Sequence, residues 1–130
     1  MIPNQNVDSI TINSLGFRGV EFSAEKPSDT YRIFMIGGST MFGVGASSDE
    51  TTIPGILQKL FDLDNSVQKI EVINAGIQGA NSSTELSLIT EKLLWYEPDL
   101  VIVYDGLNDL KADLPVEKTK TYWESMCSVS

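Results

Sequence analysis

Residues 31–45 read YRIFMIGGSTMFGVG, and their order predicts a buried strand that leads into a glycine-rich loop. The first six residues, 31–36, are mostly isoleucine and aromatic side chains, which is typical of a buried strand. Gly37 and Gly38 follow, and Ser39 comes directly after them. A strand that delivers a hydroxyl to a turn before a helix is one way in which proteins present a nucleophile. The same pattern also occurs in ordinary α/β connections and in loops that bind anions.

Beyond this loop the chain alternates between predicted helices and predicted strands. Helical spacing predicts helices over residues 49–64 and 82–96, and short apolar runs predict strands over 70–74 and 100–104. Apolar strands that are separated by helices indicate a parallel sheet with right-handed crossovers. The sequence therefore predicts an α/β fold.

Both helices carry apolar residues at the spacing of one helical face. Ser82 and Glu85 have the spacing of a capping box, which predicts that the second helix begins there. The residues expected to face the sheet are Ile53, Ile56, Leu57, Leu60 and Phe61 in the first helix, and Leu86, Ile89, Leu93 and Leu94 in the second.

The sequence divides into three parts: an N-terminal arm over residues 1–30, an α/β core over 31–110 and a tail over 111–130. Residues 9–13 alternate between polar and apolar side chains, as a half-buried edge strand does. The tail is mixed in character, and its apolar residues around 122–126 suggest a short helix.

Three side chains of the arm have predicted roles. Phe17 and Phe22 are expected to anchor the arm on the core. Arg18 is a candidate ligand contact, although a lone arginine on an arm is more often an exposed or locally paired charge.

Composition excludes several classes of partner. The net charge is −9, and an acidic chain repels the phosphates of nucleic acids and of anionic lipids, so we expect neither as a partner. No apolar run approaches the ~20 residues of a membrane-spanning helix, and the first residues do not resemble a secretory signal. The single cysteine, Cys127, fits a reducing compartment, so a cytoplasmic location is predicted.

Three polar loops follow the three predicted strands. The carboxyl ends of parallel strands meet at one edge of a sheet, where ligands bind. With the first strand in the centre, Ser39 would face the backbone N–H of Gly79 on one side and the Asn108 amide on the other. A hydroxyl with such donors nearby suits acyl transfer, because the donors stabilise the oxyanion that forms when the hydroxyl attacks a carbonyl.

Three short stretches carry a resemblance to a known family. GGST at residues 37–40, NAGIQGANS at 74–82 and GLND at 106–109 resemble the first three sequence blocks of the SGNH/GDSL hydrolases. NSLGFR at 13–18 resembles the segment before the first block in many members. The resemblance implies a flavodoxin-like three-layer α/β/α sandwich with strand order 2-1-3-4-5, of which this chain holds the N-terminal part only.

The resemblance also implies roles for the residues in these blocks. Ser39 corresponds to the nucleophile, and the N–H groups of Ser39 and Gly79 together with the Asn108 side chain form the oxyanion hole. The implied activities are those of an esterase, a lipase or a carbohydrate O-acetyl esterase or transferase, acting on a small acyl ester or an acetylated glycan. No metal or organic cofactor is expected.

The chain departs from the family pattern in two ways. Gly38 replaces the aspartate of the common GDS motif, as in an accepted branch. The family's last block, Asp-x-x-His, is missing, and the sequence contains no histidine. A serine hydroxyl needs a base to take its proton, and Asp105 and Asp109 are weak bases at their ordinary pKa. We therefore expect an inactive or crippled site, in a fragment of a longer hydrolase.

Several alternatives remain at this stage. The open edge of the third strand would allow two chains to pair as a homodimer. The chain could be a non-catalytic binding module that keeps the oxyanion pocket for a carboxylate, an acyl group or a glycan. A phosphate or nucleotide binder ranks lower, because residues 37–45 lack the P-loop and dinucleotide motifs.

Overall fold

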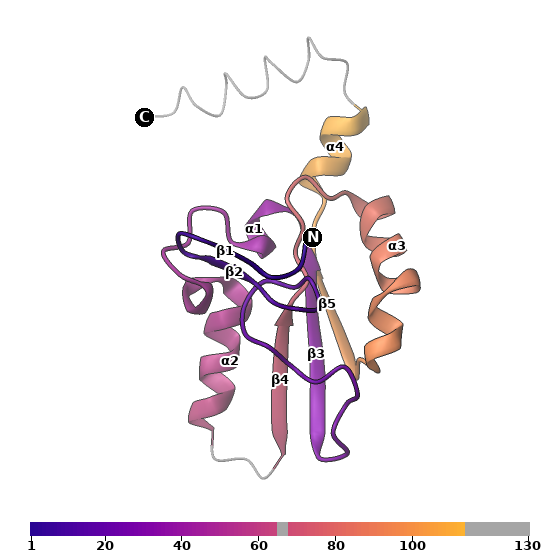
Figure 1. Cartoon of the computed structure of the whole chain (residues 1–130). Helices are drawn as coiled ribbons and strands as arrows, with labels where there is room; N and C mark the ends of the chain where they lie inside the picture. Colours follow the sequence, from indigo (N-terminus) through magenta and orange to yellow (C-terminus); the bar gives the residue numbers. More distant parts are fainter. Residues whose placement is uncertain (65–67, 114–130) are drawn as a thin grey trace.

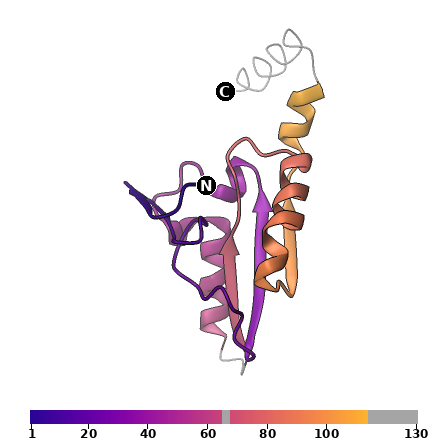
Figure 2. The same ribbon diagram turned by 45° about the vertical axis from the view of Figure 1, so that its right-hand side comes forward.

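A parallel sheet of three strands lies at the centre of the computed structural model, which describes residues 1–64 and 68–113 (Figure 1). The strand order is β4 (Lys69–Asn74), β3 (Thr30–Gly37) and β5 (Leu100–Tyr104). All strands run in the same direction, and α2 and α3 lie on opposite sides of the sheet (Figures 1 and 2). The predicted α/β fold with the first strand in the middle is therefore confirmed.

Strand β3 is apolar on both faces because it is covered on both faces. Ile33 and Met35 face α2, and Phe34 and Ile36 face α3. All four side chains are buried, and burial of such a side chain stabilises a fold by about 1.5–3 kcal/mol. This alternation follows from the two-residue period of a strand. Because each side chain must face its own helix, the carboxyl end of β3 has a fixed position relative to α2 and α3.

The N-terminal arm packs on the α3 side of the sheet through its aromatic residues. Phe17 is 1% exposed, and its ring lies 5.5–5.6 Å from the ring centres of Phe34, Phe22 and Tyr96. The predicted anchoring by the two phenylalanines is confirmed. Arg18 is also buried, and its partner is Asp49, at 2.7 Å. Arg18 is thus a paired charge, as predicted, but it is buried, and its partner lies 31 residues away in the sequence.

The predicted edge strand of the arm is only partly correct. β2 (Ile10–Ile12) pairs antiparallel with β1 (Gln5–Val7), so both belong to a separate two-stranded sheet. Single bridges link Ile12 to Arg18 and Arg18 to Asn74. The arm therefore reaches the outer edge of β4 at one point and does not extend the main sheet.

The first predicted helix begins later than residue 49. Asp49–Thr51 form a single 3-10 turn, η1, and the α-helix α2 spans Ile53–Leu63. Thr52 separates the two, because its Oγ1 accepts a hydrogen bond from the N–H of Gly55 at 3.1 Å and so caps α2. The sequence predicts an earlier start for this helix because Ser48 and Asp49 are also residues that commonly cap a helix.

The second predicted helix is divided, and its predicted capping box is wrong. α3 spans Ser82–Glu91, and a 3-10 turn, η2, spans Leu93–Tyr96. The cap of α3 is Asn81, whose Oδ1 accepts from the N–H of Thr84 at 3.0 Å. Lys92 breaks the helix, and its Nζ donates to the carbonyl of Leu15 at 2.7 Å.

Only part of each predicted apolar face is covered. Leu57 and Phe61 pack on the sheet from α2, and Ile89 and Leu93 do so from α3 and η2. The others are 43–62% exposed, because a three-stranded sheet is narrower than the apolar faces of its helices: Ile53, Ile56, Leu60, Leu86 and Leu94. The predicted helix around 122–126 lies outside the described residues.

The outer edge of β4 is covered by a side chain. Gln58 of α2 accepts from the N–H of Val72 at 2.6 Å and donates to the carbonyl of Ile70 at 3.0 Å. Nearer the carboxyl end of the same edge, the carbonyl of Asn74 accepts from the N–H of Arg18 at 3.3 Å. The Gln58 amide thus replaces the peptide group of a neighbouring strand, which protects an otherwise open sheet edge.

We predict that Gln58→Leu lowers the free energy of unfolding by about 1–3 kcal/mol, because it leaves an N–H and a carbonyl of β4 without partners. Urea unfolding followed by circular dichroism measures the effect. Gln78→Leu, at an exposed loop position, is the matched control and should change stability little. Equal effects of the two substitutions would show that Gln58 does not protect the edge.

Candidate functional site

The loop after β3 contains a short helix that the sequence analysis did not predict. α1 spans Ser39–Phe42, so Ser39 is its first residue and lies at the carboxyl end of β3 (Figure 1). The N–H of Phe42 donates to the carbonyl of Gly38 at 3.0 Å. Gly43 ends the helix with a φ of 92°, a conformation that favours glycine. The glycines that suggested a loose loop instead begin and end one helical turn.

The loop after β4 lies directly against α1. A Cβ atom on Gly76 would lie 2.3 Å from the backbone nitrogen of Phe42, so no larger residue fits without movement. Further along, Gly79 has a φ of 77° and is exposed. Ala80 closes this turn by donating its N–H to the carbonyl of Ile77 at 3.1 Å.

The loop after β5 brings Asn108 to the other two loops. Asn108 lies in α4 (Leu107–Asp113), and its Nδ2 donates to the carbonyl of Ala80 at 2.6 Å. A Cβ atom on Gly38 would lie 2.6 Å from the same nitrogen. The Asn108 amide is therefore in contact with the residues next to Ser39 and next to Gly79. An amide nitrogen carries two hydrogens, and the second has no acceptor among the described residues.

The structure thus brings the three predicted residues to one end of the sheet. Ser39 is exposed, and none of the described residues forms a hydrogen bond with its side chain. The roles of Ser39 as nucleophile and of Gly79 and Asn108 as oxyanion donors remain predictions. A residue larger than glycine at position 38 would require the Asn108 amide to move, because its Cβ would lie 2.6 Å from Asn108 Nδ2.

Asp109 links the second and third loops. Its carboxylate accepts hydrogen bonds from the backbone N–H of Ser82 at 3.1 Å and from the Ser82 hydroxyl. Ser82 is the first residue of α3, so the carboxylate lies at the positive end of that helix. The Ser82 hydroxyl, above all, lowers the pKa of Asp109 below its ordinary value. Asp109 is therefore a weaker base than an ordinary aspartate.

Glu85 is a buried carboxyl group that the sequence analysis took for a helix cap. It is 4% exposed, and its Oε1 has no hydrogen-bond donor among the described residues. Burial, together with the nearby charges of Asp105 and Asp109, raises the pKa of Glu85 to about 7. A carboxyl group that keeps its proton is neutral, and this lowers the cost of burying it beside Asp105 and Asp109. The sequence did contain a signal for this burial, because Glu85 lies on the same face of the helix as the apolar residue Ile89.

Two hollows border the main sheet, and neither is lined by Ser39. One, of about 550 Å³, is bordered by Glu85, Asp105 and Asp109. The other, of about 630 Å³, lies between the arm, α2 and the outer edge of β4, where Arg18 and Asn74 border it. Ser39 instead lies on the open surface, so a substrate pocket at this serine would need residues beyond those that the structure describes.

We predict that Glu85 makes the protein less stable as the pH rises from about 4.5 to 7. The unfolded chain releases this proton near the ordinary pKa of 4.5, whereas the folded protein holds it to about 7, so the folded state binds more protons over this range. Urea unfolding at pH 4.5 and pH 8 should show a smaller loss of stability for Glu85→Gln than for the unchanged protein. Glu91→Gln, on the exposed side of α3, should leave the pH dependence unchanged, and equal slopes for all three proteins would contradict the burial of Glu85.

The described part of the chain contains neither a metal-binding cluster nor a membrane-spanning helix. No group of three or more acidic, cysteine or histidine side chains in residues 1–64 and 68–113 is arranged to hold a metal ion. None of the helices in those ranges has the length and apolar character needed to cross a membrane.

Comparison with known proteins identifies a family for this chain. The model of the GDSL-like Lipase/Acylhydrolase family matches residues 35–128, which is well over half of the chain. No curated protein matches the sequence. The family match confirms the resemblance drawn from residues 37–40, 74–82 and 106–109, and the three-stranded parallel sheet agrees with part of the SGNH hydrolase fold. The chain therefore belongs to the GDSL-like lipase/acylhydrolase family, whose general class is the SGNH-type hydrolases.

Proposed function

We propose that this chain carries the nucleophile and the oxyanion donors of a serine ester hydrolase. The observation that supports the proposal most directly is the position of the Asn108 amide, which touches Gly38 and bonds to Ala80. This contact gathers the three loops that bear Ser39, Gly79 and Asn108. The family match supports the hydrolase class in general.

In the proposed reaction, the Ser39 Oγ attacks the carbonyl carbon of an ester and forms a bond to it. The carbonyl oxygen becomes negatively charged, and the N–H groups of Ser39 and Gly79 and the free N–H of Asn108 stabilise it. The serine hydroxyl proton passes to solvent, the ester C–O bond breaks, and the alcohol leaves with a proton taken from solvent. Water then attacks the acyl-serine carbonyl, and breaking its bond to Oγ releases the carboxylic acid and restores the serine hydroxyl. The proposed substrates are small acyl esters or acetylated glycans, because an exposed serine can be reached by a small acyl group even when the alcohol part of the ester is bulky.

None of the described residues is placed to act as a general base for Ser39. The sequence contains no histidine. The Asp109 carboxylate already accepts hydrogen bonds from the hydroxyl and the backbone N–H of Ser82. Glu85 has a pKa in the range of a base at neutral pH, but it faces Asp105 and Asp109, and none of the contacts described here joins it to Ser39. Reaction at Ser39 in this chain alone is therefore expected to be slow.

A fluorophosphonate probe tests the nucleophile directly, because it needs no turnover. The Ser39 Oγ forms a bond to phosphorus, the phosphorus–fluorine bond breaks, fluoride leaves, and the hydroxyl proton passes to solvent. We predict slow labelling at Ser39, detected by mass spectrometry of peptides. Labelling should be lost in Ser39→Ala, and it should be kept in Thr40→Ala, the neighbouring exposed hydroxyl.

The same probe tests the donor. Asn108→Leu should slow labelling by about 100-fold or more, which is the usual effect of removing one oxyanion donor. Equal labelling of the unchanged protein and of Ser39→Ala would contradict the assignment of the nucleophile.

The absence of histidine favours one second candidate, a binding module that keeps the donors and lacks turnover. Its expected ligand is a carboxylate, an acyl group or a glycan. No labelling at Ser39, combined with thermal stabilisation by acetate that Asn108→Leu abolishes, would favour this candidate over the hydrolase.

A further inference from the structure

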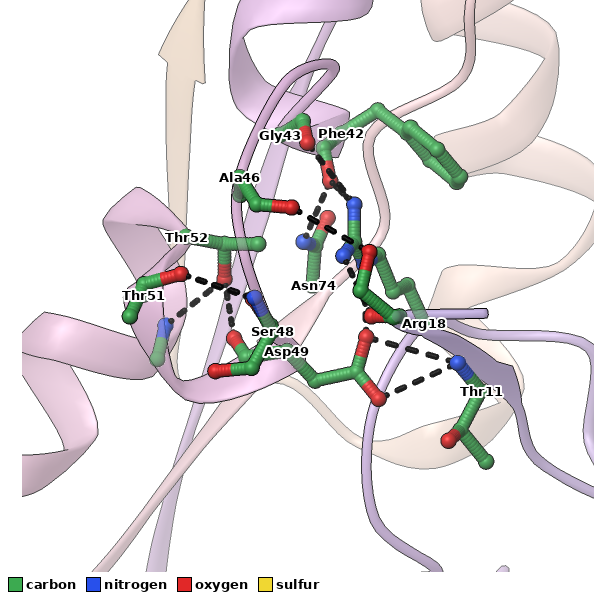
Figure 3. Close-up of polar contacts among 12 residues, drawn as sticks. Thr11, Arg18, Phe42, Gly43, Ala46, Ser48, Asp49, Thr51, Thr52 and Asn74 are labelled. Atoms are coloured by element: carbon green, nitrogen blue, oxygen red, sulfur yellow. Dashed lines mark hydrogen bonds and ion pairs between the residues drawn. The ribbon is translucent and has the colours of Figure 1, made fainter. Parts of the chain in front are cut away.

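The guanidinium group of Arg18 is buried where the arm meets the loop after β3. Its side chain is 1% exposed, and every nitrogen donates a hydrogen bond (Figure 3). Nε donates to the Asp49 carboxylate at 2.7 Å, and Nη2 donates to the carbonyl of Ser9 at 3.0 Å. A buried arginine with this many partners has a fixed position.

The remaining nitrogen of Arg18 holds the end of α1. Nη1 donates to the carbonyls of Phe42 at 3.1 Å and of Gly43 at 2.9 Å. Asn74 Nδ2 also donates to the carbonyl of Phe42, at 3.1 Å (Figure 3). The last carbonyls of a helix have no partners within it, and a positive charge beside them is favourable. Arg18 therefore caps α1 at its carboxyl end.

A helix of four residues does not hold its own shape, because one turn fixes several torsion angles for very few hydrogen bonds. The N–H groups of Gly43 and Val44 both donate to the carbonyl of Ser39, at 3.0 Å. The carbonyl of Ser39 is thus bonded to Gly43, whose own carbonyl Arg18 holds, and to the next residue, Val44. Movement of the carboxyl end of α1 would move Ser39.

The carboxylate of Asp49 holds Arg18 in turn. It accepts from Arg18 and also from the backbone N–H of Thr11, at 3.1 Å to Oδ2 and 3.4 Å to Oδ1. Asp49 begins η1, so the ion pair connects the arm to the segment before α2. Lysine in place of Arg18 would put a single ammonium group where three nitrogens now point in three directions.

We propose that Arg18 is a positioning residue for Ser39, which it holds in place through the carboxyl end of α1. The inference rests on the proposed function of Ser39, and it adds a residue outside the three sequence blocks to the machinery of the site. None of the hydrogen bonds of Arg18 goes to Ser39 itself, so Arg18 acts only through the α1 backbone.

The test compares Arg18→Lys with Arg32→Lys in the 130-residue chain. Arg32 is a matched control: its side chain is fully buried, it pairs with Glu71 at 2.9 Å, and it donates to the carbonyls of Ser23 and Tyr96. It lies near the amino end of β3, whereas Ser39 lies beyond the carboxyl end. Both variants are studied at a temperature at which circular dichroism shows them folded.

The first measurement is the rate constant of fluorophosphonate labelling at saturating probe, separated from the probe's binding constant. We expect Arg18→Lys to lower this rate constant by about 10- to 100-fold, the effect of a displaced reacting group. Arg32→Lys should leave it unchanged. Equal rate constants for the two variants would overturn the inference.

The second measurement is amide hydrogen exchange at residues 42–44, and it does not depend on reactivity. Exchange at these amides should accelerate by about 10-fold or more in Arg18→Lys, because local opening becomes easier, and should not change in Arg32→Lys. Unchanged exchange in Arg18→Lys would overturn the inference. If the unchanged protein is not labelled at Ser39, the proposed nucleophile fails, and the exchange result alone then decides whether Arg18 fixes this position.

Discussion

The buried strand β3 is the constraint on which the rest of the structure depends. It is hydrogen-bonded to β4 on one side and to β5 on the other, and side chains of α2 and α3 cover its two faces. A strand that is enclosed in this way cannot slide by one residue without turning its apolar side chains to the wrong helix. The end of β3, and with it the start of α1, therefore has a fixed place relative to the loops after β4 and β5.

Two buried arginines attach the N-terminal arm to the two ends of this sheet. Arg32 bonds to the carbonyl of Ser23 and to the carboxylate of Glu71, and Arg18 bonds to Asp49 and to the end of α1. An unpaired buried charge is very costly, so each arginine keeps its partners close. The arm is thus part of the support for the site, although it contributes none of the predicted reacting groups.

The region around the site is acidic, and this limits its chemistry. Glu85, Asp105 and Asp109 border one hollow beside α3 and α4. Proton retention by Glu85 relieves the repulsion among the three carboxyl groups, and hydrogen bonds from Ser82 stabilise the charge on Asp109. The negative charges would oppose the approach of an anionic substrate, whereas a neutral ester meets no such barrier.

The sequence by itself determined the three strands of the main sheet, their order and the family. Residues 31–36, 70–74 and 100–104 are short apolar runs, and such runs have few alternatives in a chain whose helices show clear periodicity. The three motifs after these strands were sufficient to place Ser39, Gly79 and Asn108 at one edge of a parallel sheet, because strand direction alone fixes that edge.

Only the tertiary structure decided which polar side chains are buried and what they hold. Arg18 and Asp49 are 31 residues apart, Ser82 and Asp109 are 27 apart, and Glu85 meets Asp105 from a different element. No local pattern encodes such pairs, since each depends on how two elements pack. The same reason explains why Ile56 and Leu86 are exposed: periodicity marks an apolar face, but the width of the sheet beneath it decides how much of that face is covered.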